Sequence, residues 1–347
     1  MTTPSVTRQY QLPQIGTYNN LVLTEGQVPL PRANEVLLKV HAVSLQFRDL
    51  IVSKGLYGVP MPDNLIPCSD MAGEIIALGK VVQNWKVGDR VCSNFATDHI
   101  HGPTNPAIQK SSLGAQSHGV LTQYKVVPAH SLVAIPEHLS YEEASTLPCA
   151  ALTAYNALNG PVPIKAGDYV LVLGTGGVSI AALQFAVAAG ATVIATSSSD
   201  EKLKIASKLG AKHVINYNKT PQWDEEIKKI TKDVGVDHVI EVGGPGTLQK
   251  SINSTRVGSG YIHIIGFVSQ DKGDSNPILP LIRNAVTLRG IQIGSVAQFE
   301  DMNRLITANP DVTRPVIDRV FAFEKAIDAY AHLESQKHVG KVVVKVA

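Results

Sequence analysis

A glycine-rich turn near the middle of the chain has the residue types and spacing that bind a dinucleotide. The apolar stretch 170–173 leads into Gly174-Thr175-Gly176-Gly177-Val178, after which a helical pattern begins. The first glycine allows a tight turn, and Gly176 lets a pyrophosphate approach the backbone beside the free N–H groups of the helix. Because the loop joins a strand to a helix, we favour a dinucleotide site over a purely structural turn.

The residues after the next strand favour NADP over NAD. An NAD site usually has Asp or Glu about 20 residues after the glycines, where the carboxylate accepts hydrogen bonds from the ribose. Here Ser197 and Ser198 occupy the place of the acid, and Lys202 lies one turn into the following helix. Hydroxyl and N–H groups bind a 2′-phosphate without like-charge repulsion. We therefore predict NADP(H), although these serines could also simply cap the helix.

The elements that position these loops predict an α/β chain of two domains. From residue 169, apolar strands alternate strictly with helices, which is typical of a doubly wound parallel sheet. The expected strands are 169–173, 192–196, 213–215, 236–242, 261–265 and 286–293. Before residue 150 the pattern is β-rich, and after about 294 it becomes two helices and a strand at 341–346. We expect a Rossmann domain at 151–293 and a second domain made of 1–150 and 294–347.

Local patterns predict two helix starts and one long loop. Capping boxes at 140–143 and 198–201 each predict the first turn of a helix, and the first helix should continue past Pro148 toward residue 158. The stretch 94–119 is rich in Ser, His, Gly and Pro, with little periodicity. A loop of this length is usually functional or mobile, so we expect a lid.

Composition excludes several classes of protein. The 31 basic and 29 acidic residues give a net charge of +2 without a basic cluster, so we expect no nucleic-acid partner. The first 12 residues lack an apolar signal core, and the most apolar window, 178–195, is interrupted by Gln184 and Gly190. That window favours a buried helix and strand over a membrane span. The three cysteines lie far apart, which favours a reducing, cytoplasmic location.

Beside the glycine loop, short motifs occur in a fixed order and spacing along nearly the whole chain. They are Asn34-Glu35-Val36-Leu37, Arg48-Asp49-Leu50, Ala72-Gly73-Glu74, Val87-Gly88-Asp89-Arg90-Val91, 147–155 (Leu-Pro-Cys-Ala-Ala-Leu-Thr-Ala-Tyr) and Val339-Gly340-Lys341-Val342-Val343. Together they resemble the medium-chain dehydrogenase/reductase superfamily. The resemblance implies a GroES-like, β-rich catalytic domain that is split around the Rossmann domain.

The metal-binding part of the family pattern is missing. Zinc alcohol dehydrogenases hold their catalytic zinc with a Cys, the His of a Gly-His-Glu motif and a second Cys. By resemblance, those positions are Gln46, Ser69 and Cys149 here, and the proton-relay position before Asp49 is Arg48. One thiol cannot hold a zinc that needs three protein ligands. The chain is therefore similar to the zinc-independent quinone-oxidoreductase-like branch, and we expect no metal.

Other candidate metal or nucleophilic residues lack partners at suitable spacing. His99, His101 and His118 lie in the stretch 94–119 without an acidic or Cys partner beside them, and we interpret them as surface residues. Cys149 has no His or Asn in an ordered motif, so we interpret it as a small wall residue.

Without zinc, a site should favour substrates that stabilise their own charge after hydride transfer, as quinones and enones do. Gln46 is the first candidate to donate a hydrogen bond to the substrate oxygen, and Tyr57 and Ser69 are further candidates. Asp49 and Asp70 either titrate in the site or bond backbone donors.

The resemblance also implies cofactor contacts outside the glycine loop. Thr153 would contact the nicotinamide amide, and Gly266 and Phe267 would pass under its ring. Lys341 would reach the cofactor phosphates.

The first functional hypothesis is an NADPH-dependent reductase of a small apolar quinone, enone or related carbonyl compound. An enoyl reductase of a biosynthetic pathway, a zinc-independent NAD(P)-dependent alcohol dehydrogenase and a non-catalytic NADPH-binding protein are the alternatives. The superfamily commonly pairs Rossmann domains through the strand near 286–293, so the resemblance also implies a possible homodimer.

Overall fold

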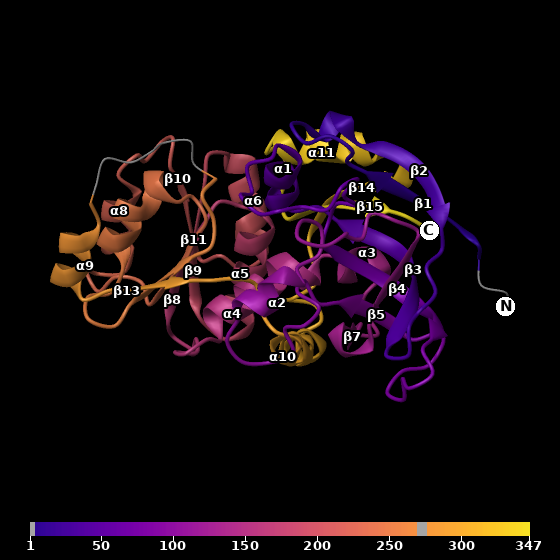
Figure 1. The fold of residues 1–347 in the computed structure, drawn as a ribbon. Helices are drawn as coiled ribbons and strands as arrows, with labels where there is room; N and C mark the ends of the chain where they lie inside the picture. The colour runs from indigo at the N-terminus through magenta and orange to yellow at the C-terminus, as the bar shows by residue number, and fades with distance from the viewer. Residues whose placement is uncertain (1–3, 269–275) are drawn as a thin grey trace. The chain divides into compact units, whose positions relative to one another are not determined.

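The structure is a computed structural model that describes residues 4–268 and 276–347. The chain forms two compact units, and each is described by itself (Figure 1). Unit 1 consists of Met1–Leu152, Ile293–Ala308 and Arg314–Ala347, and unit 2 consists of Thr153–Gln292 and Asn309–Thr313. Within the described ranges, no helix is long and apolar enough to cross a membrane.

Unit 2 is built on a six-stranded parallel sheet with the order β10-β9-β8-β11-β12-β13. The strands are β8 (Tyr169–Leu173), β9 (Thr192–Ser197), β10 (His213–Asn216), β11 (His238–Glu241), β12 (Tyr261–Ile264) and β13 (Thr287–Gly290). The central strands are almost entirely buried, because helices cover a parallel sheet on both faces. The predicted doubly wound sheet is confirmed.

The direction of the chain reverses between β8 and β11. From β8 the chain moves outward to β9 and β10, and from β11 it moves the other way to β12 and β13. The connecting helices are α5 (Gly177–Ala188), α6 (Asp200–Lys208), α7 (Trp223–Ile230), α8 (Pro245–Ser254) and α9 (Ile278–Asn284), and α4 (Leu152–Leu158) precedes β8. Right-handed crossovers place α5 and α6 on one face and α7 and α8 on the other. Ligands of such sheets bind at this reversal, beside the carboxyl ends of the strands.

Unit 1 contains a seven-stranded sheet with the order β14-β15-β3-β4-β5-β7, in which β6 also pairs with β3. Its strands are β3 (Glu35–Ser44), β4 (Asp70–Leu78), β5 (Arg90–Ser93), β6 (Tyr124–Pro128), β7 (Leu132–Ala134), β14 (Ile317–Ala322) and β15 (Lys341–Lys345). A separate hairpin pairs β1 (Val6–Gln11) with β2 (Val22–Gln27). The C-terminal strand β15 pairs antiparallel with β3, so the two distant parts of the sequence share one sheet.

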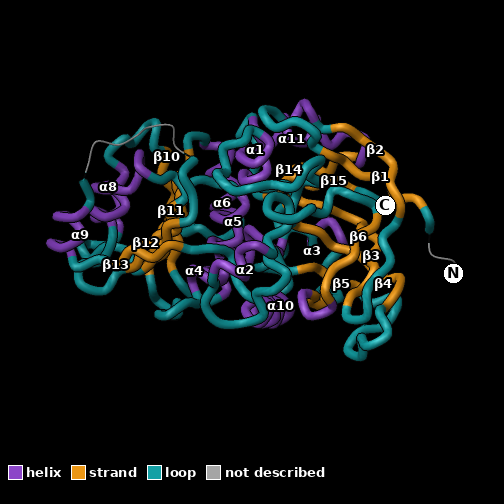
Figure 2. Tube along the Cα trace, viewed as in Figure 1, coloured by secondary structure: helices purple, strands orange, loops and turns teal. Residues whose placement is uncertain are grey.

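Most helices of unit 1 are short, whereas α10 has 13 residues; Figure 2 shows the helices in purple. They are α1 (Phe47–Ser53), α2 (Pro106–Lys110), α3 (Tyr141–Ala144), a π-helical turn (Leu147–Ala151), α10 (Val296–Ala308) and α11 (Ala326–Glu334). The capping box at Ser140 is confirmed, because its hydroxyl accepts from Glu143 N at 3.1 Å and Glu143 Oε2 accepts from Ser140 N at 2.8 Å. The predicted continuous helix is broken, since Pro148 has no N–H to donate and the chain forms a π turn there.

Some predicted boundaries are wrong for identifiable reasons. The N-cap of α6 is Ser199 and not Ser198, because the Ser199 hydroxyl accepts from Lys202 N at 3.4 Å. Strand β14 was not expected, since it is mostly exposed at a sheet edge and has no apolar alternation. The stretch 94–119 contains α2 and several buried side chains, among them Phe95, His99 and Leu113. Its two ends are packed, whereas residues 100–107 are exposed, so its role as a lid stays a prediction.

Candidate active site

One buried carboxylate organises the polar residues of unit 1. Asp70 is the first residue of β4 and is fully buried. Its carboxylate accepts hydrogen bonds from Gln46 Nε2 at 2.5 Å, Ser69 Oγ at 2.6 Å and Cys149 N at 2.9 Å. The register pairs Asp70 with Ser44 at the end of β3, which explains how Gln46, two residues later, reaches it. We call Asp70 and these three donors the Asp70 cluster.

One further carboxylate, Asp49, and two cations, Arg48 and Lys341, act on this cluster. Burial raises the pKa of Asp70 to about 6, against the opposing charge of Lys341. Burial likewise raises the pKa of Asp49 to about 6, against the charge of Arg48. Lys341 donates from Nζ to the carbonyl of Leu45, and burial lowers its pKa. A carboxylate with a pKa near 6 exchanges its proton near neutral pH, so the charge of this region depends on pH.

Gln46 has no donor to spare for a substrate. Nε2 donates one hydrogen to Asp70 and the other to the hydroxyl oxygen of Ser44, which lies 3.5 Å from the nitrogen. The backbone N–H of Gln46 also donates, at 2.7 Å, to Asp49 at the start of α1. Ser69 donates its hydroxyl proton to Asp70 and is fully buried. Two of the three predicted donors are therefore committed within the protein.

Tyr57 is the predicted donor whose hydroxyl is not bonded within the described part of the protein. The side chain is half-buried, and its hydroxyl makes no hydrogen bond to the described residues. Its ring lies against the guanidinium of Arg48, with 4.6 Å from the guanidinium carbon to the ring centroid. Gly55 and Gly58 have φ angles of +74° and +71°, so two left-handed residues turn the chain back after α1 and bring Tyr57 over Arg48.

Arg48 also contacts the segment after β5, through the Phe95 ring and the Leu113 carbonyl. Its guanidinium carbon lies 4.6 Å from the centroid of the Phe95 ring, and its Nη1 donates to the carbonyl of Leu113 at 2.9 Å. Leu113 in turn donates its N–H to the carbonyl of Phe95 at 3.0 Å. Tyr57, Arg48 and Phe95 thus form a stacked trio, which we call the arginine sandwich.

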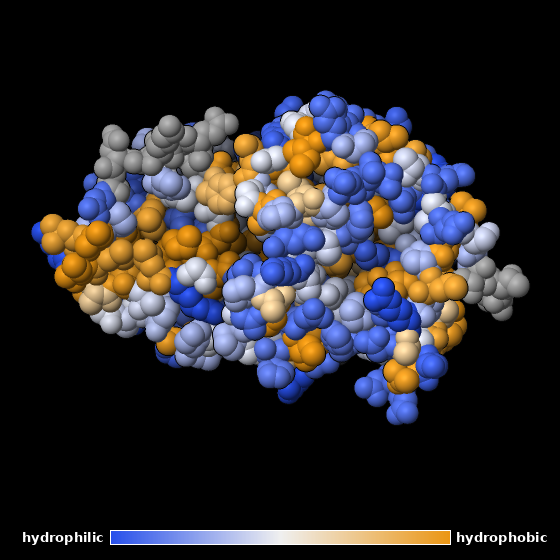
Figure 3. Space-filling model, viewed as in Figure 1, coloured by the Kyte–Doolittle hydropathy of each residue, from blue (hydrophilic) through white to orange (hydrophobic). Residues whose placement is uncertain are grey.

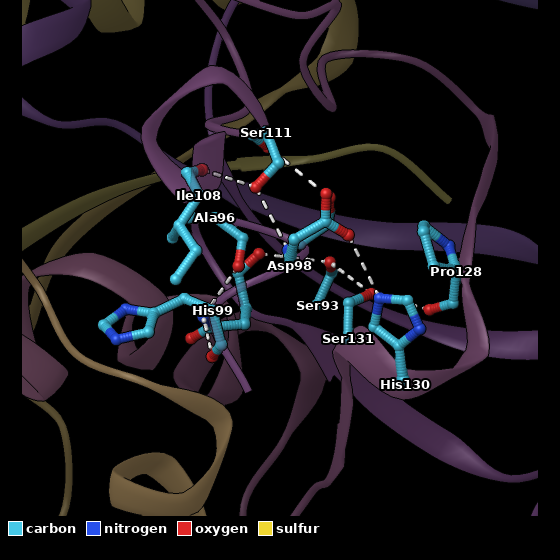
Figure 4. A network of polar contacts seen from close by, with 11 residues as sticks. Ser93, Ala96, Asp98, His99, Ile108, Ser111, Pro128, His130 and Ser131 are labelled. Atoms are coloured by element: carbon cyan, nitrogen blue, oxygen red, sulfur yellow. Dashed lines mark hydrogen bonds and ion pairs between the residues drawn. The ribbon is translucent and has the colours of Figure 1, made fainter. Parts of the chain in front are cut away.

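A polar network fixes the segment that carries Phe95 (Figure 4). The Ser111 hydroxyl accepts from Asp98 N at 3.0 Å and donates to the Ile108 carbonyl at 2.7 Å. His130 Nε2 lies 3.1 Å from Asp98 Oδ1, and the hydroxyls of Ser93 and Ser131 lie 3.3 Å apart. The Phe95 ring is therefore held by a bonded backbone on both sides.

The residues at the expected zinc positions do not fit a zinc ion. Gln46 offers an amide, Ser69 a hydroxyl that donates to Asp70, and Cys149 a thiol whose pKa burial raises further. Zinc takes thiolate, imidazole or carboxylate ligands, and the nearby ammonium of Lys341 would repel a cation. Within 4–268 and 276–347, no group of three or more His, Cys, Asp or Glu is placed to hold a metal. His99 instead bonds the Gly102 carbonyl at 2.8 Å.

The glycine turn of unit 2 has room for a pyrophosphate. It follows β8 at the reversal of strand order, and Gly176 is the N-cap of α5 without a side-chain cap. Gly174 has a φ of +74°, and a Cβ added to Gly174 or Gly176 would meet no atom within 4 Å. Thr175 is buried, and Gly177 and Val178 begin the helix. The residues fit a dinucleotide, which would occupy the open side of both glycines.

A second observation in unit 2 also fits a bound cofactor. Thr153 is buried, and its hydroxyl has no hydrogen-bond partner among the described residues. Buried hydroxyls normally have a partner, so this one fits the predicted contact with the nicotinamide amide.

The end of β9 carries no carboxylate. Ser197 is buried, and its hydroxyl accepts from Ser199 N at 3.3 Å, whereas Ser198 is exposed and Lys202 is half-buried on α6. The first acidic residue is Asp200, whose carboxylate is bound by Asn216 at 2.8 Å and Lys219 at 2.6 Å.

The loops after β11 and β12 pack closely, and a carboxylate that we did not predict supports them. Glu241 is fully buried, and its Oε1 accepts from Gly243 N, Gly244 N and Thr247 Oγ1. A Cβ on Gly266 would meet the Val242 carbonyl at 2.7 Å, so only glycine fits there. Phe267 is 60% exposed beside this packing. Glu241 could not be predicted, because one acidic residue in an apolar strand has no distinguishing spacing.

Lys341 is a buried lysine at the start of β15. It belongs to unit 1, and its amine faces the buried carboxylates Asp70 and Asp49. Its contact with cofactor phosphates stays a prediction.

A dinucleotide turn on a doubly wound sheet, together with a β-rich unit that carries a buried polar cluster, defines a dinucleotide-binding oxidoreductase. Two family models match the chain, "Alcohol dehydrogenase GroES-like domain" over residues 32–137 and "Zinc-binding dehydrogenase" over residues 177–308. A zinc-type alcohol dehydrogenase-like protein of Schizosaccharomyces pombe is 47% identical over 339 residues, which cover 96% of this chain and 97% of that protein. The chain belongs to the medium-chain dehydrogenase/reductase superfamily.

Other relatives show the range of the family. Quinone oxidoreductase of Homo sapiens is 28% identical and covers 88% of this chain and 87% of its own length. A solved structure from Sinorhizobium meliloti, assigned to the alcohol dehydrogenases, has a TM-score of 0.92 at 36% identity and covers 99% of this chain and 100% of its own. A mycobacterial structure complexed with NADPH has a TM-score of 0.82 at 26% identity and covers 98% of this chain and 100% of its own.

Proposed function

We propose that this protein is a zinc-independent, NADPH-dependent reductase of a small apolar quinone, enone or related activated carbonyl compound. The observation that carries the proposal is the Asp70 cluster. The residues at the three positions where zinc dehydrogenases have ligands all donate to one carboxylate, so hydrogen bonds to Asp70 organise this region. A site without a Lewis acid favours substrates that delocalise their own negative charge.

Tyr57 is the residue that we assign to the substrate oxygen. Reduced nicotinamide, when bound, supplies a hydride. In an enone the new C–H bond forms at the β-carbon, the C=C electron pair shifts to a new double bond between the α-carbon and the carbonyl carbon, and the C=O π pair moves to the oxygen. The hydroxyl of Tyr57, which no described residue engages, gives its proton to that oxygen and later regains one from water. Gln46 and Ser69 hold Asp70 in place and are positioning residues.

The cofactor proposal depends on the end of β9. Ser197 and Ser198 replace the acid that binds a ribose hydroxyl in NAD enzymes, and Asp200 is already bound by Asn216 and Lys219. One similar structure is described as complexed with NADPH and another as an NAD-dependent alcohol dehydrogenase, so names of relatives do not decide the cofactor.

The decisive experiment is NADPH oxidation by chelator-treated protein with a panel of quinones, cyclic and linear enones, and aldehydes. We expect turnover on quinones or enones without metal. Turnover restored only by zinc would refute the proposal. Activity only with alcohols and NADP⁺ would establish an alcohol dehydrogenase, activity only with enoyl thioesters an enoyl reductase, and tight NADPH binding without any turnover a non-catalytic protein.

Tyr57→Phe tests the assigned proton donor. It removes the hydroxyl and keeps the ring against Arg48, so we expect kcat to fall about 100-fold with little change in the KM for NADPH. Tyr217→Phe, on the exposed loop after β10, is the matched control and should leave kcat unchanged. An unchanged kcat in Tyr57→Phe would remove Tyr57 from the mechanism.

We also propose that the chain forms a homodimer through the free edge of β13. β13 is the last strand of the sheet of unit 2. On neighbouring α9, Ile278, Leu279 and Ile282 are 61%, 62% and 71% exposed, and Figure 3 shows apolar side chains gathered over these elements. An exposed edge beside apolar side chains is suited to pairing with a second copy. We place the protein in the cytoplasm, because its three cysteines are free.

A further inference from the structure

Arg48 is a half-buried cation, and part of its guanidinium is buried without a hydrogen-bond partner among the described residues. Its Nη1 donates to Leu113, but its Nε and Nη2 are buried and have no partner among the described residues. No carboxylate of the described residues lies within ion-pair distance of its guanidinium. Buried guanidinium N–H groups without a hydrogen-bond partner are unfavourable unless other groups stabilise the charge. The rings of Tyr57 and Phe95 each lie 4.6 Å from the guanidinium carbon, and the carboxylates of Asp49 and Asp70 attract the same charge from beyond ion-pair distance.

We propose that Arg48 is the positioning residue of Tyr57 and that its charge stabilises the phenolate formed when the Tyr57 proton passes to the substrate oxygen. The inference rests on the proposed function, which assigns the proton donor to Tyr57. As the O–H bond breaks, its electron pair stays on Oη, and negative charge spreads into the ring that faces the guanidinium. The attraction between cation and ring grows during the transfer, so it lowers the barrier instead of strengthening substrate binding.

The geometry holds the pair in this arrangement from both sides. Arg48 is in the first turn of α1, and Tyr57 returns over it through the two left-handed glycines. On the other side Phe95 and Leu113 bond each other, and Leu113 accepts from Arg48. This packing leaves the guanidinium few alternative positions, so the cation stays against the Tyr57 ring throughout the reaction.

The other charged groups of this region belong to the Asp70 cluster and its neighbours. Asp49 and Asp70 are carboxylates that ionise near pH 6, and Lys341 is an ammonium beside them. Because the charge of Arg48 lowers the pKa of both carboxylates, Arg48→Gln raises the two pKa values further. The kcat values should therefore be compared on the alkaline side of each variant's profile, where both carboxylates are ionised. The difference between variants then reports the charge of Arg48.

The test compares Arg48→Gln with Arg48→Lys. Glutamine keeps a donor for the Leu113 carbonyl but removes the charge, whereas lysine keeps the charge without the planar stacking. Arg90→Gln is the matched control, because Arg90 lies 4.6 Å over the ring of Tyr141 and donates to the Leu139 carbonyl at 2.6 Å, outside the site. Thermal unfolding of each variant identifies any loss of folding.

We expect Arg48→Gln to lower kcat about tenfold at an unchanged KM for NADPH, which corresponds to ~1.4 kcal/mol. Arg48→Lys should recover most of that loss, and Arg90→Gln should lose none. In the Tyr57→Phe background, Arg48→Gln should cause no further loss, since the two residues act through one proton.

Two results would overturn the inference. One is a kcat in Arg48→Gln equal to the wild type, and the other is an equal tenfold loss with and without the Tyr57 hydroxyl. Either result leaves the reductase assignment standing if kcat of Tyr57→Phe is still about 100-fold below that of the wild type. If the wild type turns over no substrate of the panel, the proposed function itself fails, and the role of Arg48 fails with it.

Discussion

The buried carboxylate of Asp70 should make the stability of this protein fall as the pH rises. Burial raises the pKa of Asp70 from 3.8 to about 6. Between pH 3.8 and about 6, the folded state binds the Asp70 proton more tightly than the unfolded state does. The contribution of this proton to the free energy of unfolding is therefore fully present below pH 3.8 and is lost as the pH rises through 6. A difference of about 2 in pKa corresponds to ~3 kcal/mol.

Asp70→Asn isolates this contribution, because an amide of the same shape cannot ionise. It loses acceptors for Gln46 and Cys149, but that cost does not depend on pH. The assay is urea unfolding of both proteins at a series of pH values from 4 to 7.5, analysed as the difference in free energy of unfolding. We expect the wild type to lose ~3 kcal/mol relative to Asp70→Asn across that range.

A control variant should behave in the opposite way. Hydrogen bonds from Lys54 and Tyr18 lower the pKa of Glu334, so its contribution is present at neutral pH and lost as the pH falls. The difference between the wild type and Glu334→Gln should therefore increase with pH. A flat or increasing difference for Asp70→Asn would show that the carboxylate is not desolvated, and the argument from burial would fail.

Three further predictions concern unit 2. Gly176→Val should abolish NADPH binding in calorimetry with an unchanged unfolding midpoint, because its backbone is extended and its Cβ meets nothing in the protein; retained affinity would mean a different cofactor site. Ser197→Asp should raise the Kd of NADPH at least tenfold and that of NADH much less, by repulsion of the 2′-phosphate; equal changes would refute the 2′-phosphate site. Ile282→Lys on exposed α9 should convert a dimer to a monomer in light scattering, and an unchanged mass would exclude this face.

The sequence alone was sufficient for the features that depend on local periodicity and backbone chemistry. Continuous apolar strands alternating with helices predicted the parallel sheet, and the glycine turn lies directly after β8 as its spacing indicated. The Ser140 capping box was predictable because its two hydrogen bonds join residues three apart. The α6 cap was misplaced by one residue, since three consecutive serines offer the same hydroxyl and only the local backbone selects Ser199.

The donor assignment within the site required the tertiary structure. Gln46 was the first candidate because of its position in a motif, but its N–H groups are directed to Asp70 and Ser44. Tyr57 is left with an unengaged hydroxyl because two glycines turn it onto Arg48.

The sequence by itself determined that this protein has a parallel α/β unit with a dinucleotide turn, and that zinc-ligand residues are missing from a recognisable family pattern. These properties follow from residue type and short-range spacing. Only the tertiary structure decided that Asp70 gathers Gln46, Ser69 and Cys149, and that Arg48 is stacked between two rings. Gln46 and Cys149 lie 24 and 79 positions from Asp70 in the sequence, so strand register and loop packing, rather than local sequence, set which of these groups meet.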